Sequence, residues 1–253
     1  MTLPLRAAIF DVDGTLVDSE RHGHRVAFNR AFEQFDLPYR WDEDTYGELL
    51  HVTGGQRRID GYLAEQGVSE PVRAELVPAL HARKTELLEE LVEQGVIEVR
   101  PGAQRLLGEL ADAGVALAVG TTGSRRWVER LLRGMLPAVA WDVIVTGDDV
   151  SERKPDPEVF TVALRQLGLD GPGGAVVLED SGEGMGAARA ARLCCAVVVN
   201  GYTVDHDLAG ADLVLDGFGS ADAPAAVLAD PHDTGSDGIL TVDLLRTLLQ
   251  RSR

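Results

Sequence analysis

The sequence predicts a doubly wound α/β fold with a parallel sheet and with a helical domain inserted after the first strand. Short apolar segments rich in β-branched residues alternate with amphipathic helical patterns along most of the 253 residues. Between about residues 19 and 94 the alternation stops, and only helical patterns remain. We therefore expect an α/β core formed by residues 1–18 and 95–253, with an α-helical cap domain formed by residues 19–94.

Five apolar segments predict buried parallel strands, because a strand covered on both faces carries a continuous apolar run. They cover residues 5–10, 115–120, 143–146, 175–178 and 195–199. Sheets of this kind place their functional sites beyond the carboxyl ends of the strands. The residues that follow these five segments are therefore the first candidates for a site.

Helices are predicted where apolar residues recur at helical spacing and a glycine follows as a stop signal. In the core, one such pattern contains Phe160, Ala163, Leu164 and Leu167 before Gly168, and another contains Leu106, Leu107 and Leu110 before Gly114. The insertion carries Phe28, Ala31, Phe32 and Phe35, then a Leu-rich pattern over 71–91 that Pro78 should kink or divide. The tail after Gly217 closes with Leu240, Leu244, Leu245 and Leu248, which we expect to pack on the core.

Charge and composition exclude several classes of partner. The formal net charge of −17 opposes binding to nucleic acids or anionic membrane surfaces, since both are polyanions. The longest apolar run, residues 193–199, is far too short to span a membrane, and the N-terminus does not resemble a signal peptide. The adjacent Cys194 and Cys195 are expected to be buried, reduced thiols. We expect a cytoplasmic protein, a monomer or weak dimer, that acts on a small molecule.

The strongest chemical signal is Asp11-Val12-Asp13-Gly14-Thr15, directly after the first predicted strand. Two carboxylates at this spacing can converge on one metal and one substrate, and Gly14 permits the tight turn between them. A calcium loop is the alternative reading, because Glu20 lies six residues after Gly14. Thr15 and Val17 are poor calcium ligands, and an apolar strand replaces the entering helix, so the pattern favours a catalytic loop.

Four such segments follow four predicted strands, and together they resemble the haloacid dehalogenase superfamily of phosphohydrolases. The first is the Asp11 segment; the others are Thr121-Thr122-Gly123-Ser124, Lys154-Pro155 and Glu179-Asp180. Each short segment alone is uninformative, but four in this order form a specific signal. The resemblance implies a Rossmann-like core of this superfamily.

The resemblance also implies the chemistry of a phosphoryl transfer. Asp11 is expected to attack phosphorus, Asp13 to act as general acid and base, and Lys154 to neutralise charge. Thr121 and the neighbouring Thr122, Gly123 and Ser124 are expected to hold the phosphoryl oxygens. Mg²⁺ is the expected cofactor. Its expected ligands are Asp11, Asp13 through its carbonyl oxygen, Glu179 and Asp180.

Two segments of the insertion, residues 19–29 and 52–59, resemble the CbbY-type branch of this superfamily. That branch is associated with the dephosphorylation of xylulose 1,5-bisphosphate to xylulose 5-phosphate, beside the Calvin cycle. A bisphosphate needs a second anion site, which basic side chains and glycine N–H groups can provide. The expected substrate contacts are Glu20, His24, Thr53, Gly54, Gly55, Gln56 and Arg57, with Arg58 left as a solvated residue.

The sequence departs from the branch in two motifs and leaves other functions open. Gly123 stands where the branch commonly has Thr or Ser, so a possible hydroxyl contact is lost, and Arg153 stands where a lysine is usual. A β-phosphoglucomutase-like phosphomutase, a broad small-metabolite phosphatase and a non-catalytic sugar-phosphate sensor are the alternatives. Thr15 favours hydrolysis over a mutase. The glycines at 182, 184 and 186 suggest close helix packing more than nucleotide binding.

Overall fold

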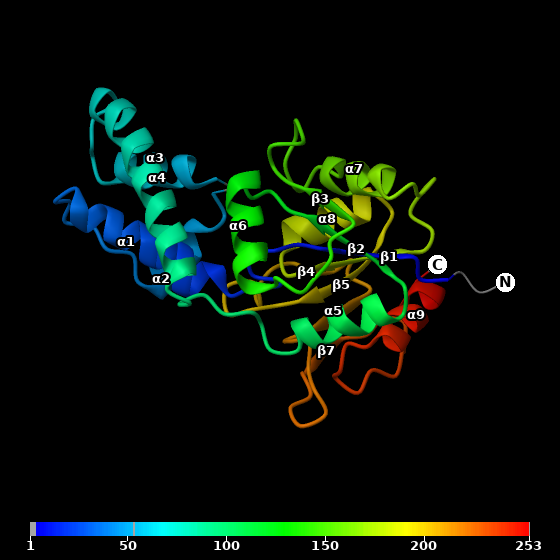
Figure 1. The fold of residues 1–253 in the computed structure, drawn as a ribbon. Helices are drawn as coiled ribbons and strands as arrows, with labels where there is room; N and C mark the ends of the chain where they lie inside the picture. Colours follow the sequence, from blue (N-terminus) through cyan, green and yellow to red (C-terminus); the bar gives the residue numbers. More distant parts are fainter. Residues whose placement is uncertain (1–3, 53, 253) are drawn as a thin grey trace. The chain divides into compact units, whose positions relative to one another are not determined.

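Strand β1 lies between β2 and β4 in a seven-stranded sheet of the computed structural model, which describes residues 4–52 and 54–252 (Figure 1). The strand order is β3-β2-β1-β4-β5-β6-β7; β1 to β6 are parallel, and β7 is antiparallel to β6. The strands are β1 (Ala7–Phe10), β2 (Ala116–Gly120), β3 (Val143–Val145), β4 (Ala175–Glu179), β5 (Cys194–Val198), β6 (Leu213–Leu215) and β7 (Val227–Ala229). The five predicted strands and the doubly wound parallel sheet are confirmed.

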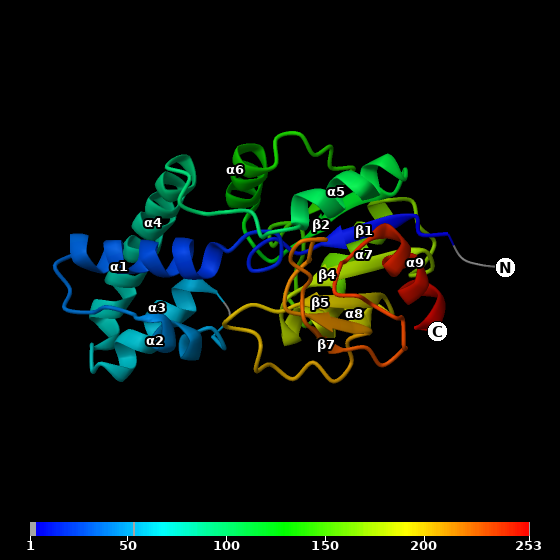
Figure 2. The same cartoon turned by 90° about the horizontal axis from the view of Figure 1, so that it is seen from below.

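Helices cover both faces of this sheet, as the predicted fold class requires. Figures 1 and 2 show α7 and α8 on one face and α5 and α9 on the other. The helices of this unit are α5 (Ala103–Asp112), α6 (Arg125–Met135), α7 (Glu158–Gln166), α8 (Gly182–Ala190) and α9 (Val242–Arg251). Helix α9 buries the predicted Leu stripe of the tail and contacts β4 and α5. The expectation that the tail packs on the core is confirmed.

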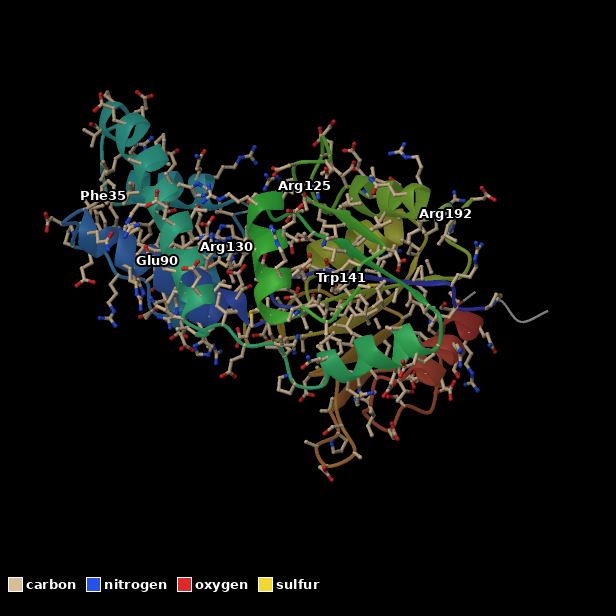
Figure 3. The ribbon with its side chains drawn as sticks, in the orientation of Figure 1. Phe35, Glu90, Arg125, Arg130, Trp141 and Arg192 are labelled. Carbon is tan, nitrogen blue, oxygen red and sulfur yellow. The ribbon has the colours of Figure 1, made fainter. Side chains whose placement is uncertain are left out.

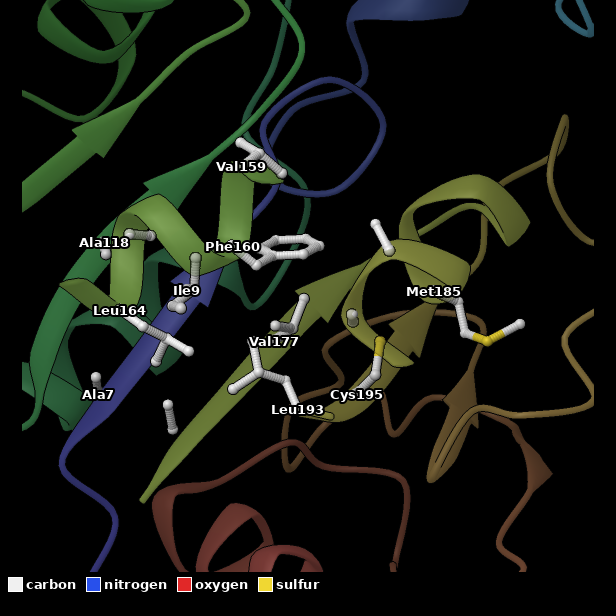
Figure 4. Packing of buried hydrophobic residues seen from close by; sticks show 14 of the residues in the cluster. Ala7, Ile9, Ala118, Val159, Phe160, Leu164, Val177, Met185, Leu193 and Cys195 are labelled. Atoms are coloured by element: carbon white, nitrogen blue, oxygen red, sulfur yellow. The ribbon is translucent and has the colours of Figure 1, made fainter. Parts of the chain in front are cut away.

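The strands are apolar on both faces because each face meets a layer of helices. In Figure 4, Ile9 and Val177 point from β1 and β4 toward Phe160 and Leu164 of α7. All of these side chains are buried, as are those of Cys194 and Cys195 in β5. Burial raises the pKa of the Cys195 thiol well above its ordinary value, consistent with an inert core residue. The core thereby holds the strand ends in fixed register.

A separate helical unit is formed by Asp18–Glu98, while Met1–Val17 and Val99–Arg253 form the sheet unit. Its elements are the π-helical turn η1 (Glu20–His24) and the helices α1 (Arg25–Gln34), α2 (Glu43–Leu49), α3 (Gly55–Glu65) and α4 (Glu70–Glu93). Its core is aromatic, with Phe28, Trp41 and Tyr46 packed around one another. The side-chain amide of Asn29 donates to the carbonyl of Trp41 and its oxygen accepts from the Trp41 N–H, both at 2.7 Å.

The structure differs from the sequence-based expectations at two places. Pro78 does not divide the Leu-rich pattern, because α4 runs without a break through it. Its buried residues on both sides, Val77 and Leu80 among them, hold the helix together by packing, which outweighs the loss of one backbone hydrogen bond. Strands β6 and β7 were not predicted; all three residues of β7 are exposed, so this strand forms no buried apolar run. No helix in the described ranges is long and apolar enough to cross a lipid bilayer.

Candidate active site

The four predicted motifs meet at the carboxyl edge of the sheet, beside its topological switch point. From β1 the chain passes to β2 and β3 on one side, and then to β4 on the other. Asp11 directly follows β1, and Asp180 directly follows the adjacent β4. Thr121 follows β2, and Lys154 lies in the loop between β3 and α7. Ligands of doubly wound sheets bind at this position because adjacent strands diverge there.

Lys154 bridges two carboxylates at the centre of the site. Its Nζ donates to Asp11 Oδ1 and to Glu179 Oε1, each at 2.6 Å, and all three side chains are buried. Burial disfavours the charged form of Lys154, but the attraction of Asp11 and Glu179 prevails and raises its pKa. Lys154 is therefore a fixed positive charge beside Asp11, as the sequence predicts.

The Asp11 carboxyl lies in an environment that resists its ionisation. Burial raises its pKa from 3.8 to about 7; Lys154 opposes this rise, and the negative charge of Glu179 adds to it. Burial and the neighbouring Glu179 and Asp11 also raise the pKa of Asp180. Additional positive charge between Asp11 and Asp180 would favour the ionised form of both groups.

Both carboxylate oxygens of Glu179 accept hydrogen bonds from the protein itself. Oε1 accepts from Lys154, while Oε2 accepts from the N–H groups of Asp180 and Ser181 and from the Ser181 hydroxyl, at 2.9 to 3.1 Å. A Cβ on Gly184 would lie 1.9 Å from Glu179 Cδ, so only glycine fits at this point of α8. This glycine makes room for a site carboxylate, in addition to the helix packing that the sequence suggests.

Asp180 is held by donors on both oxygens. Thr15 Oγ1 donates to Oδ1 at 3.2 Å, and Asn200 Nδ2 donates to Oδ2 at 2.7 Å. The Arg100 guanidinium fixes the surrounding backbone by donating to the carbonyls of Gly14 at 2.8 Å and Val198 at 2.6 Å. The turn after Asp11 and the end of β5 are thus tied together around Asp180.

The segment after β2 is tied to its surroundings by hydrogen bonds. Thr121 is buried, and its Oγ1 accepts from the Gly123 N–H at 3.2 Å. The Gly123 carbonyl accepts from the Gly147 N–H at 2.9 Å, which ties the segment to the loop after β3. Thr122 is half-buried and Ser124 precedes the first turn of α6. This arrangement suits an anion at the start of α6.

Asp13 lies beside α6 and not in the Lys154 network. The indole N–H of Trp127 donates to both of its carboxylate oxygens, at 3.3 Å to Oδ1 and 3.2 Å to Oδ2. The two aspartates of the first motif therefore have different surroundings. Asp11 faces a cation and other carboxylates, while Asp13 faces a neutral donor.

Mg²⁺ fits this site as a centre with two carboxylates. No group of three carboxylate, histidine or cysteine side chains in the described residues forms a complete metal cage. Mg²⁺ does not need one, because it commonly binds one or two carboxylates and keeps several waters. The raised pKa values of Asp11 and Asp180 mark two buried carboxylates that a divalent cation would stabilise. Glu179, with both oxygens occupied, is better placed to hold Lys154 than to bind a metal.

The substrate contacts expected in the helical unit have mixed surroundings. Tyr46 donates its hydroxyl to Glu20 Oε2 at 2.5 Å, and Arg58 Nη1 donates to Tyr46 Oη at 3.2 Å. Arg58 is buried, whereas Gln56 and Arg57 are exposed. The expectation that Arg58 is a solvated residue is therefore wrong. Thr53 lies outside the described residues.

A second cluster surrounds the start of α3. Gly54, with φ of 96°, precedes the helix, and a Cβ on Gly55 would lie 2.9 Å from the His81 ring. Lys84 is 4% exposed; its Nζ lies 2.8 Å from His24 Nδ1 and 4.7 Å from the centroid of the Phe28 ring. Burial, then Lys84 and His24, lower the pKa of His81 to about 4. A buried ammonium and helical N–H groups together suit an anion.

Several of these residues carried no recognisable signal in the sequence. Tyr46, Lys84, Trp127 and Asn200 lie outside the motifs, and only folding brings them beside Glu20, His24, Asp13 and Asp180. A lysine or tryptophan in an amphipathic helix ordinarily belongs to its solvated or buried face. Spacing alone could not have identified them.

The chain matches a known family and its relatives over most of its length. The model of the haloacid dehalogenase-like hydrolase family matches residues 5–192. CbbY from Cereibacter sphaeroides is 42% identical over 218 residues, which cover 85% of this chain and 93% of that protein. A CBBY-like protein of Arabidopsis thaliana is 41% identical over 86% of this chain and 70% of its own length.

Solved structures agree with this match. The crystal structure of an aspartate-to-asparagine mutant of CbbY from Rhodobacter sphaeroides, in complex with xylulose 1,5-bisphosphate, is 40% identical. It matches with a TM-score of 0.74 and covers 84% of this chain and 94% of that chain. A structure described as a β-phosphoglucomutase from Thermotoga maritima is 26% identical, with a TM-score of 0.65 over 83% of this chain and 93% of that chain.

Proposed function

The chain belongs to the haloacid dehalogenase-like hydrolase family, within which it is a phosphoric monoester hydrolase, and we propose that it converts xylulose 1,5-bisphosphate to xylulose 5-phosphate. The observation that carries this proposal is the buried Asp11–Lys154–Glu179 network at the switch point of the sheet. Similarity to CbbY along both units supports the choice of substrate. Such an activity would belong beside the Calvin cycle.

Asp11 is the nucleophile in this mechanism. Its carboxylate attacks phosphorus and forms an aspartyl-phosphate, while the bond from phosphorus to the sugar oxygen breaks. Lys154, fixed 2.6 Å from Asp11 Oδ1, compensates the negative charge of the nucleophile and of the arriving phosphate. Thr121 and the N–H groups at the start of α6 bind the phosphoryl oxygens.

Asp13 moves the protons in both halves of the reaction. In the first half its protonated carboxyl gives a proton to the departing sugar oxygen, which leaves as a hydroxyl. In the second half its carboxylate takes a proton from the water that attacks the aspartyl-phosphate, which restores Asp11 and releases phosphate.

Mg²⁺ is the cofactor we propose, and when bound it would neutralise charge on the transferred phosphoryl group. Asp11 and Asp180 would hold it with the carbonyl oxygen of Asp13, and Thr15 and Asn200 orient Asp180 for that role. Glu179 supports the site by fixing Lys154 and the turn before α8.

A bisphosphate also needs recognition of the phosphate that is not transferred. In the helical unit, Lys84, His24 and the N-terminus of α3 at Gly55 form a cationic cluster suited to that group. The Glu20–Tyr46–Arg58 chain offers acceptors and donors for sugar hydroxyls. We propose these two groups as the determinants of a sugar bisphosphate.

The proposal is tested by phosphate release in the presence of Mg²⁺ from five substrates, with the Asp11→Asn variant as the blank. The substrates are xylulose 1,5-bisphosphate, ribulose 1,5-bisphosphate, fructose 1,6-bisphosphate, glucose 6-phosphate and β-glucose 1-phosphate. We expect kcat/KM to be highest for xylulose 1,5-bisphosphate and to vanish in the variant. Equal turnover of all five would refute the substrate and leave the phosphatase chemistry intact.

The same panel separates the phosphatase from a mutase. Similarity to a structure described as a β-phosphoglucomutase makes this the second candidate. Conversion of β-glucose 1-phosphate to glucose 6-phosphate, stimulated by glucose 1,6-bisphosphate and without phosphate release, would establish the mutase in its place. Hydrolysis of xylulose 1,5-bisphosphate with no such conversion excludes it.

A further inference from the structure

Trp127 and Asp13 form a pair that none of the four sequence motifs contains. The indole Nε1 lies almost equally far from the two carboxylate oxygens of Asp13, at 3.3 and 3.2 Å. Trp127 is 4% exposed, so this donor acts where water competes little with it. One N–H shared by two oxygens directs the plane of the carboxylate toward the indole and fixes its rotamer.

The indole has room in this position because residue 123 is glycine. A Cβ on Gly123 would lie 3.3 Å from Trp127 Cδ1, 3.1 Å from Val128 Cγ2 and 3.5 Å from Asp13 Oδ2. The first two contacts are tighter than most side chains accept, so a larger residue here would press on the indole. In this chain the side chain is missing, and the Trp127 ring lies against the space beside it.

Helix α6, which carries Trp127, is anchored at its first turn. The Arg125 N–H donates to Asp148 Oδ2 at 2.8 Å, and its guanidinium donates to the Ile144 carbonyl at 3.1 Å (Figure 3). On the inner face, Val128, Leu131 and Leu132 are buried beside Trp127. The ring is therefore held by a helix fixed to the β3 end of the sheet, which makes it a rigid support.

We propose that Trp127 is a positioning residue for the general acid and base Asp13, and that the glycine at position 123 leaves the space its ring needs. The proposal rests on the proposed function, because it assigns Trp127 a role in that reaction. The indole donates to the carboxylate while Asp13 awaits or returns its proton, so the rotamer that faces the leaving oxygen is kept through both halves. The indole is a neutral donor, so it orients Asp13 without adding a charge beside it.

The hydrogen bond can be observed without any turnover. The chain has three tryptophans, Trp41, Trp127 and Trp141, so a ¹H–¹⁵N spectrum should contain three indole signals, which single Trp→Phe variants assign. In Asp13→Ala the acceptor is lost, and we expect the Trp127 indole proton to move upfield while the other two stay in place. An unmoved Trp127 signal would overturn the proposal.

The kinetic test uses Trp127→Phe, which keeps an aromatic ring but removes the N–H donor together with part of the ring volume. With xylulose 1,5-bisphosphate we expect kcat to fall about 10- to 100-fold, part of the general acid–base contribution, with KM within about twofold. With 4-nitrophenyl phosphate, the burst of nitrophenolate in rapid mixing reports transfer to Asp11 alone. It should be nearly unchanged, because this leaving group needs no proton. Equal losses in both measurements would indicate a merely structural effect and refute the proposal.

A swap of donors gives the sharpest control. In the parent chain, Gly123→Ser should lower kcat, because the new side chain presses on the indole. In a chain that already carries Trp127→Leu, Gly123→Ser should raise kcat about tenfold, because the serine hydroxyl can reach Asp13. Thermal unfolding of each variant confirms that it folds. If Gly123→Ser acts equally in both backgrounds, the positioning role of the indole N–H is refuted. If the parent enzyme hydrolyses no phosphate ester, the proposed function fails, while the indole spectrum still reports the contact.

Discussion

Two buried lysines, one in each unit of the molecule, have opposite surroundings. Lys154 of the sheet unit is 8% exposed and lies 2.6 Å from each of two carboxylates. Lys84 of the helical unit is 4% exposed and contacts the His24 imidazole and the face of Phe28. A lysine neutralised by carboxylates can support chemistry on a nearby group, and one that contacts an imidazole and an aromatic face can bind an anion. The comparison is consistent with the proposal that Lys154 serves catalysis and Lys84 serves recognition.

Asp11→Asn should give the largest effect, because it removes the nucleophile from the first network. We expect kcat for any phosphate ester to fall by at least about 10⁴-fold, with the fold preserved. Steady-state phosphate release measures this loss, and circular dichroism checks the fold. Residual activity above about 1% would place the nucleophile elsewhere.

Asp11→Asn should also change the free energy of unfolding, and the raised pKa of Asp11 determines whether it rises or falls. Its folded pKa of about 7 exceeds the ordinary 3.8, so ionisation destabilises the native state as pH rises from about 4 to 7. In EDTA, Asp11→Asn should therefore be more stable than the parent at pH 8, and the difference should disappear near pH 4. Urea unfolding at both pH values tests this, and a variant less stable at pH 8 would contradict it.

Lys154→Met tests the catalytic lysine at its own position. It leaves Glu179 and Asp11 buried without their shared cation, so we expect a loss of about 3–5 kcal/mol in the free energy of unfolding. We also expect kcat to fall about 10²- to 10³-fold, because a preorganised positive charge is lost from the site. Urea titration and steady-state kinetics measure the two effects. A stable variant with normal kcat would remove Lys154 from the mechanism.

Lys84→Met is the matched change in the helical unit, and it should affect binding and not chemistry. We expect KM for xylulose 1,5-bisphosphate to rise about 10- to 100-fold, the value of one charged hydrogen bond, while kcat for a monophosphate is unchanged. Steady-state kinetics with both substrates measure this. If the kinetic parameters for the monophosphate worsened equally, Lys84 would not be specific for the second phosphate, which would contradict the proposal.

Tyr46→Phe probes the hydroxyl that links Glu20 to Arg58. Deleting it leaves a buried guanidinium without one acceptor, so stability should fall by about 1–3 kcal/mol. We expect a smaller rise in KM than for Lys84→Met, since no charge is removed. Thermal unfolding and kinetics measure both quantities, and the Phe variant keeps the aromatic packing as an internal control.

His81→Gln should give the smallest effect, and only in acid. The folded pKa of His81 is about 4 and its ordinary value is 6.5, so the unfolded chain takes up the proton first as pH falls. Stability that is fully present above pH 6.5 should decline toward pH 4 in the parent, and less steeply in the variant. Parallel slopes in urea unfolding at pH 7, 6 and 5 would contradict this.

The sequence by itself determined the class of fold and the chemical residues. Apolar runs of strand length with helical patterns between them predict the parallel sheet, because each element must bury one face or both. The residues after β1, β2, β3 and β4 were identified in advance because parallel strands end at one edge, where Asp11 and Lys154 do meet. Strands β6 and β7 were not predicted; β7 is exposed along its length, so it forms no buried apolar run.

Only the tertiary structure decided which side chains support those residues and how each is charged. Trp127 lies 114 residues from Asp13, and Asn200 lies 20 residues from Asp180, so no local pattern joins them. Burial raises the pKa of Asp11. Arg58 is buried, whereas its sequence neighbour Arg57 is exposed. These properties depend on desolvation and on contacts between distant segments. Both come into existence only when the chain has folded, which is why the sequence could name the reacting groups but not their environment.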